Sequence, residues 1–234
     1  MVNAINERLS NEFEQSADAI INGDLDTLKA LIDRYPSLVN MRSTRDHHSP
    51  LLFYVSANSV EDERQKTPNN ILDITKFLLE QGADPNAFSD AYRGNISVLG
   101  SLVSSVHPAH ANKQSDLVML LCQYGAQPDI NDNAPLKIAI AFRYPQAINA
   151  LIICGAPINH VVFASAVGDL EQVKAFVSAG VKPFTTAFGI DYTTEKEILE
   201  FALTVASMMG QVETVAYLLD QELDINNKRS AEDG

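Results

Sequence analysis

The stretch of sequence that decides the fold is residues 77–86, FLLEQGADPN. Apolar side chains end a helical pattern there, and Gly82 opens a short polar turn. A glycine directly after a helix adopts the left-handed conformation that closes the last helical turn. The stretch therefore predicts a helix that ends near Gln81, with Gly82 as the residue that terminates it.

The same pattern, an apolar helix end followed by a turn, recurs along the chain. The further copies are LIDRYPSLVN at 31–40, LLCQYGA at 120–126, LIICGAPIN at 151–159, FVSAGV at 176–181 and YLLDQELDIN at 217–226. The first copy has Pro36 near the turn, and the last has Glu222 in the place of glycine. Such self-similarity is the sequence signature of a repeat architecture.

An amphipathic helix precedes the turn in these copies. The segment GDLEQVKAF at 168–176 places its leucine, valine and phenylalanine on one helical face, and residues 210–218 and 23–31 repeat the pattern. Shorter helices rich in small residues come before them, as in ASAV at 164–167. Because one helix pair is too small to bury its own apolar face, the pairs are expected to stack into one continuous core.

Two kinds of motif carry a resemblance to a known family. The segments SPL at 49–51 and APL at 134–136 resemble the Thr-Pro-Leu-His opening of the ankyrin repeat, although the histidine is absent. GADPN at 82–86 and the Gly-x-x-Glu-x-Val pattern at 168–173 and 210–215 resemble its second-helix signature. On these residues the chain resembles the ankyrin-repeat family. The resemblance implies an all-α fold, an α-solenoid of stacked helix-turn-helix repeats with irregular loops.

The resemblance covers residues 12–227 and divides them into unequal repeats. The predicted boundaries are 12–40, 41–86, 87–129, 130–159, 160–184 and 185–227, after an N-terminal extension or helix start at 1–11 and before a disordered tail at 228–234. The family repeat has about 33 residues, so the longer repeats imply insertions. These fall in segments at 59–70 and 107–115, and we expect both to be loops.

Composition argues against several classes of partner. The formal net charge is −13 and the pI is near 4.7, so the basic footprint of a nucleic-acid binder is missing and an anionic membrane is disfavoured. No apolar run approaches the roughly 18 residues of a spanning helix, and the polar N-terminus lacks the apolar stretch of a secretory signal. We expect no nucleic-acid or membrane partner, and a location in the cytoplasm or inside a host cell to which the protein is delivered.

The common catalytic and phosphate-binding motifs are missing from the sequence. Cys122 and Cys154 lie in apolar runs, where a thiol usually behaves as a small buried hydrophobe. His107 and His110 could bind a metal together with Asp116, but stable zinc sites usually offer three or four ligands, so this signal is weak. We expect no catalytic site, no cofactor and no metal, with an enzyme or metal protein built on these histidines as an alternative.

The candidate partner-binding residues follow from the family resemblance, which places groove side chains just before and just after each first helix. Several of the side chains at these positions are basic, aromatic or methionine, types that are enriched at the centres of interfaces. The candidates are Arg45, Asp46, His48, Tyr92, Arg93, Phe142, Arg143, Met208 and Met209. Together they predict a groove that is less acidic than the rest of the chain.

The predicted function is a non-catalytic interaction module, monomeric by itself, that binds a protein or peptide partner through its concave groove and protruding turns. The alternative is an effector or an inhibitory, regulatory subunit that acts through the loops at 59–70 and 107–115. Deletion of residues 60–68 separates the two hypotheses, because loss of binding favours the loops and retained binding favours the groove.

Overall fold

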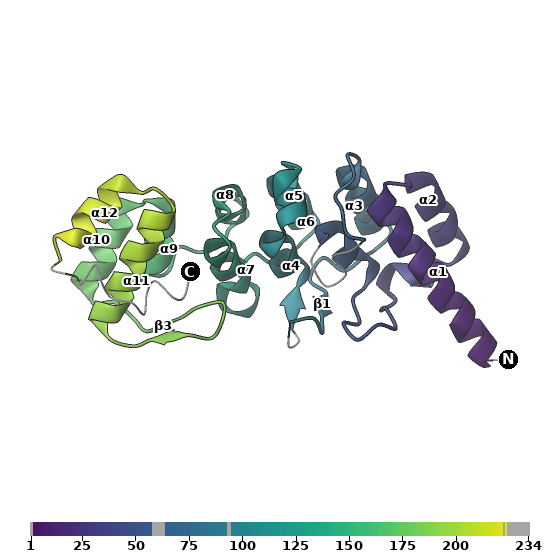
Figure 1. Ribbon diagram of the computed structural model, residues 1–234, viewed down its shortest axis with the longest axis horizontal. Helices are drawn as coiled ribbons and strands as arrows, with labels where there is room; N and C mark the ends of the chain where they lie inside the picture. The colour runs from purple at the N-terminus through teal and green to yellow at the C-terminus, as the bar shows by residue number, and fades with distance from the viewer. Residues whose placement is uncertain (1, 58–63, 93–94, 222, 224–234) are drawn as a thin grey trace. The chain divides into compact units, whose positions relative to one another are not determined.

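The computed structural model describes residues 2–57, 64–92, 95–221 and 223. Most of these residues lie in helices, which agrees with the all-α prediction, and the strands form short antiparallel pairs. The chain divides into two compact units, residues 1–130 and residues 131–234, and each unit is described by itself (Figure 1).

The first unit consists of helices packed in pairs. Its elements are α1 (Val2–Asn22), α2 (Leu25–Arg34), η1 (Pro36–Asn40), η2 (Leu51–Ser56), α3 (Ile71–Glu80), β1 (Phe88–Ser89), β2 (Ile96–Ser97), α4 (Val98–Ser104), α5 (Val106–His110) and α6 (Gln114–Gln123). Helix α1 packs on α2, η2 packs on α3, and α4 packs on α6. The pairs also contact one another, because η2 touches both α1 and α4 while α3 touches α6. Each pair therefore buries its apolar face against the next.

The second unit repeats this arrangement. Its elements are α7 (Ile130–Ala141), α8 (Pro145–Ile153), α9 (Val161–Val167), α10 (Leu170–Ala179), β3 (Phe184–Thr185), β4 (Asp191–Tyr192), α11 (Glu195–Met208) and α12 (Val212–Leu219). Helix α9 packs on α10, α11 packs on α12, and the two pairs meet through α9 with α11 and α10 with α12. Helix α8 also contacts α9.

The predicted turn glycines terminate their helices in the predicted way. Gly82, Gly125 and Gly155 have φ angles of 89°, 94° and 101°. After each one, the following alanine donates its backbone N–H to the carbonyl five residues earlier, at 3.0, 3.0 and 2.9 Å. This is the Schellman ending of a helix, so the recurring glycine pattern is confirmed as a helix-termination signal at these three positions. Glu222, the last equivalent position, lies outside the described residues.

Side-chain amides tie successive turns of the first unit together. The Asn40 amide nitrogen donates to the Gly82 carbonyl at 2.8 Å, and its oxygen accepts the N–H of Asp84 at 3.1 Å. Asn86 makes the same pair of bonds to the following turn. Its amide nitrogen donates to the Gly125 carbonyl, and its oxygen accepts the N–H of Gln127, both at 2.8 Å. Each asparagine is thus a two-bond clamp between one helix-terminating turn and the next.

Two predicted segments can be compared with the helices of the first unit. Helix α1 begins at Val2, so the predicted extension or helix start at 1–11 continues into the first repeat as one helix. The prediction of a loop at 107–115 is wrong, because α5 and the start of α6 occupy most of it. Pro108 lies in the first turn of α5, where its fixed φ and missing N–H are tolerated.

Other predicted segments fall wholly or partly outside the described residues. Of the predicted loop at 59–70, residues 64–70 contain neither helix nor strand, and residues 59–63 are not described. The predicted tail at 228–234 is not described either. The first helix of the second repeat is a 3-10 helix, η2, rather than an α-helix.

The buried core is apolar, but the two cysteines lie at its edge. Cys122 and Cys154 are thiols of intermediate exposure, so the prediction of buried thiols is wrong at both positions. Cys122 lies in the last turn of α6, and Cys154 directly follows α8. Within the part of the chain that the structure describes, every helix is too short or too polar to span a bilayer.

Candidate functional site

An apolar cleft lies within the second unit, between α7, α9, α11 and the β3–β4 hairpin. The described residues that line it are Lys137, Ile140, Ala141, Val162, Phe184, Thr186, Ala187, Phe188, Phe201 and Met208. We call it the aromatic cleft. Its empty volume is about 380 Å³ with open solvent included, but the space that its walls enclose is only about 20 Å³, room for about one water molecule. The cleft is therefore an open apolar hollow against which a side chain can pack.

The β3–β4 hairpin builds one wall of the cleft. Phe184 pairs with Tyr192 across the hairpin, so both rings project from the same face. Both are buried against Phe201 of α11, with ring centroids 5.8 and 4.6 Å from it. The turn at the hairpin tip includes Gly189, with φ 78°, and it leaves Phe188 63% exposed. Figure 1 shows the hairpin extending along the ends of the helices toward α7.

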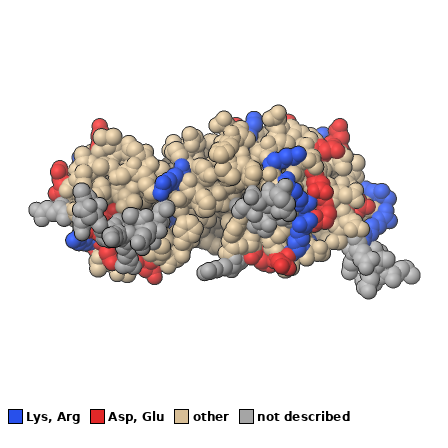
Figure 2. Space-filling model, in the orientation of Figure 1, with Lys and Arg blue, Asp and Glu red and all other residues tan. Residues whose placement is uncertain are grey.

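A lysine brings one positive charge to this apolar wall. The Lys137 side chain is only 11% exposed, and its Nζ lies 5.4 Å from the centroid of the Phe184 ring. Nζ also donates to Asp132 Oδ2 at 2.6 Å, although the Asp132 side chain is 86% exposed. Lys137 is the one ionisable side chain among the described residues that line the cleft. Figure 2 shows few charged side chains over α7 and α8 on the face toward the reader.

His160 holds the hairpin against α9. Its Nδ1 accepts the N–H of Val162 at 3.2 Å and caps α9, so the ring proton is on Nε2, which donates to the Lys182 carbonyl at 2.8 Å. The ring lies 4.8 Å from that of Phe184. Burial lowers the pKa of His160, and the charge of Lys137 lowers it further, whereas the bond to the Lys182 carbonyl opposes them. The neutral form of His160 therefore fits this site.

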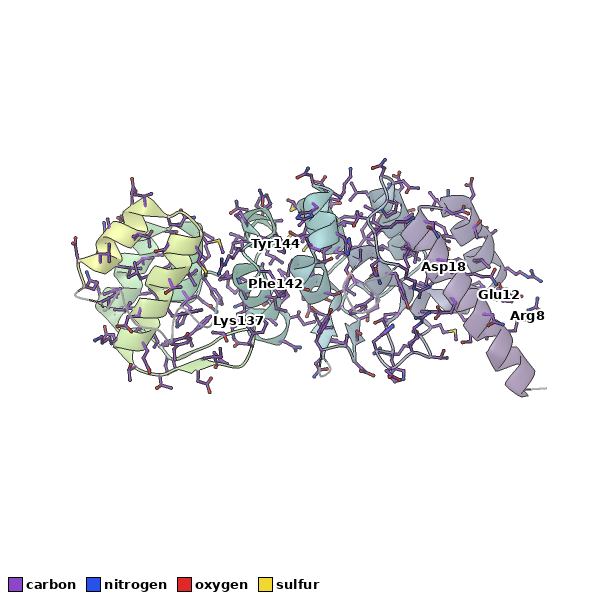
Figure 3. The ribbon with its side chains drawn as sticks, viewed as in Figure 1. Arg8, Glu12, Asp18, Lys137, Phe142 and Tyr144 are labelled. Atoms are coloured by element: carbon purple, nitrogen blue, oxygen red, sulfur yellow. The ribbon has the colours of Figure 1, made fainter. Side chains whose placement is uncertain are left out.

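Exposed aromatic rings form the rim of the cleft. Phe142 is 43% exposed and lies 6.5 Å from Tyr144 in a stacked arrangement and 6.3 Å from Phe188. Figure 3 shows Lys137, Phe142 and Tyr144 along α7 and the turn that follows it. Partial burial raises the pKa of the Tyr144 hydroxyl, which stays neutral at physiological pH. Aromatic rings left in water beside an apolar hollow are typical of interaction surfaces.

The predicted binding residues of the second unit meet at this cleft in part. Met208 lines it, and Phe142 contacts Phe188 at its rim. Arg143 is exposed with φ 59°, in the left-handed position that ends α7. Met209 is half-buried and is not one of the lining residues given above.

In the first unit, Arg45 belongs to a network of ion pairs. Its guanidinium donates to Glu14 of α1 at 2.8 and 3.3 Å. Arg64 approaches the same carboxylate at 3.1 Å and Asp18 at 2.7 Å. Asp18 lies on α1, as Figure 3 shows. Arg45 is thus paired with Glu14 within the chain, and its role toward a partner stays a prediction.

The other predicted residues of the first unit lie at the turns on either side of β1. The His48 Nδ1 is 2.8 Å from Asp90 Oδ2, and the backbone of His48 has φ 43°. Asp46 is exposed, and so is Tyr92, with φ 52°. Arg93 lies outside the described residues. These side chains belong to the first unit, and Phe142, Arg143, Met208 and Met209 belong to the second.

Three further histidines, His47, His107 and His110, lie in the first unit. His47 Nδ1 lies 2.8 Å from Ser49 Oγ, but both residues are buried and the Ser49 hydroxyl also bonds to Ser89 at 2.7 Å. His107 and His110 both lie on α5. Among the described residues, no three histidine, cysteine, aspartate or glutamate side chains cluster closely enough to hold a metal ion.

Sequence reasoning missed Lys137, Phe184 and Phe188, which complete the cleft. The available signal was the segment Phe184–Tyr192, in which aromatic residues flank a glycine turn. Comparison with known proteins adds no further guidance, because no family model and no curated protein matches this sequence.

Proposed function

We propose that the chain is an ankyrin-type repeat protein that works as a non-catalytic interaction module. Two features support this fold assignment. Three of the helix pairs end in the same glycine turn, at Gly82, Gly125 and Gly155, and asparagine clamps link successive turns of the first unit. Arrays of this kind lack an enclosed reaction chamber and present extended surfaces to partners.

The observation that carries the proposed function is the exposed aromatic rim of the aromatic cleft. Phe142 and Phe188 keep large apolar surfaces in water although an apolar hollow lies beside them. Leaving these rings exposed costs free energy unless a partner covers them. We expect the partner to be a protein or peptide that covers the rim and inserts a side chain into the cleft. We expect the module to act as a monomer in the cytoplasm or in a host cell.

Affinity capture with matched variants tests this proposal. Wild type, Phe188→Ser and Val212→Ser serve as baits in a native lysate, and each captured protein is then purified and tested for direct binding. Val212 is 77% exposed on α12 and does not line the cleft, so it controls for the loss of an exposed apolar residue. We expect a stoichiometric partner that Phe188→Ser loses and Val212→Ser keeps. Equal capture by all three baits would contradict the assignment of the surface.

The alternative, an effector or inhibitory subunit acting through the segments at 59–70 and 107–115, has less support. Arg64 in the first segment is paired with Glu14 and Asp18, which engages it within the chain. The second segment is largely helical. Capture that survives Phe188→Ser but fails after deletion of residues 60–68 would favour this alternative.

A further inference from the structure

The charged side chain that lines the aromatic cleft is opposite in sign to the net charge of the chain. The chain carries a formal net charge of −13, yet the charged side chain that lines the cleft is a lysine. The acidic chain as a whole attracts basic partners, but Lys137 disfavours a cation at the cleft itself. Local complementarity therefore favours a carboxylate there.

We propose that the cleft binds a peptide segment in which a bulky apolar side chain neighbours an aspartate or glutamate, with the apolar side chain in the cleft and the carboxylate on Lys137. This inference rests on the proposed interaction function and specifies the chemistry of the partner.

Lys137 is positioned to receive such a carboxylate. Its ammonium group lies over the Phe184 ring in a largely buried position, where a charge needs a partner. Its present partner, Asp132, is 86% exposed, so water competes for that carboxylate and weakens the pair. A carboxylate that enters with an apolar neighbour is partly withdrawn from water, which strengthens its attraction to Lys137.

The backbone around Asp132 has an uncommon conformation. Asn131, Asp132 and Asn133 have φ angles of 51°, 57° and 58°, a run of three left-handed residues. The Asn133 Oδ1 is buried without a hydrogen-bond partner. Asp132 therefore pairs with Lys137 from a segment whose conformation is itself costly. In this arrangement Asp132 acts as an internal competitor for the ligand carboxylate.

Two blocked pentapeptides test the inference, Gly-Asp-Phe-Leu-Gly and the same peptide with asparagine in place of aspartate. The full chain is titrated with each peptide, and binding is followed by NMR chemical shifts of backbone amides. We expect shifts at the residues that line the cleft and an affinity about fivefold higher for the aspartate peptide, as expected for one added ion pair. Lys137→Met should abolish that preference, so that the two peptides bind this variant with equal affinity.

Asp132→Asn should change the affinity for the aspartate peptide in the opposite direction to Lys137→Met. Removal of the internal carboxylate should raise the affinity for the aspartate peptide several-fold and leave the asparagine peptide nearly unchanged. A dispersed spectrum, like that of wild type, verifies that each variant is folded. Equal affinity for the two peptides, shifts outside the cleft, no binding of either peptide, or weaker binding by Asp132→Asn would each overturn the inference. If native capture still depends on Phe188 in those cases, the proposed function stands and only its carboxylate chemistry is wrong.

Discussion

Replacing Asn86 by alanine tests the repeat architecture, because it removes the clamp between two helix-terminating turns. The side chain makes two bonds of 2.8 Å, one donated to the Gly125 carbonyl and one accepted from the Gln127 N–H. A hydrogen bond contributes about 0.5–1.5 kcal/mol net, and water can replace part of it at this exposed position. We therefore expect Asn86→Ala to lower the free energy of unfolding by about 1–2 kcal/mol.

Urea denaturation followed by far-UV circular dichroism measures this change. Asn86→Asp keeps the acceptor oxygen and loses the donor, so we expect it to lower the free energy of unfolding by less than Asn86→Ala does. The matched control is Asn11→Ala, an exposed asparagine in α1, for which helix propensity predicts a change of about 0.5 kcal/mol or less. If Asn86→Ala unfolded at the same urea concentration as wild type, the amide clamps would not contribute to the coupling between turns.

Three further predictions concern stability. Gly82→Val should lower the free energy of unfolding by about 1 kcal/mol or more. Because φ is 89° and the space around a new Cβ is open, backbone strain alone causes this loss. An unchanged urea midpoint would refute the prediction. The pKa of His160 in the folded chain lies below its ordinary value of 6.5, so the neutral form of His160 stabilises the fold above pH 6.5. This contribution is lost as the pH falls through the folded pKa. The melting temperature should therefore fall over this pH range, and His160→Gln should make it less dependent on pH. Arg64→Gln should lower the free energy of unfolding by about 1 kcal/mol and Arg45→Gln by about a few tenths of a kcal/mol. The reason is that Arg64 is less exposed and binds two carboxylates. Equal melting temperatures of the two variants would contradict this ordering.

The helix ends were predictable from sequence because their causes are local. Gly82 and its equivalents act through the backbone conformation of a single residue, and the capping bonds span only five residues. The opening at Ala134 was also predicted, since Pro135 fits the first turn of a right-handed helix and the left-handed run ends at Asn133. Local steric preferences of this kind need no knowledge of tertiary contacts.

The candidate site was predicted less completely because it depends on contacts between distant segments. Phe142 and Met208 were selected for their positions beside the first helices, and both lie at the cleft. Phe188 belongs to a hairpin whose docking against α7 no local pattern reveals. The ion pair of Arg45 with Glu14, 31 residues away in sequence, was not predicted either. An ion pair at that separation leaves no periodic signal in the sequence.

Photo-crosslinking from the rim of the aromatic cleft tests the central claim most directly. The photoreactive residue p-benzoylphenylalanine replaces Phe188 in one sample and Val212 in the other, and both proteins are irradiated in native lysate. The account predicts one dominant crosslinked protein from position 188, with the crosslink suppressed by excess unlabelled wild type, and none of that product from position 212. The same products from both positions, or no crosslink at 188 in a lysate from which wild type captures a partner, would contradict it.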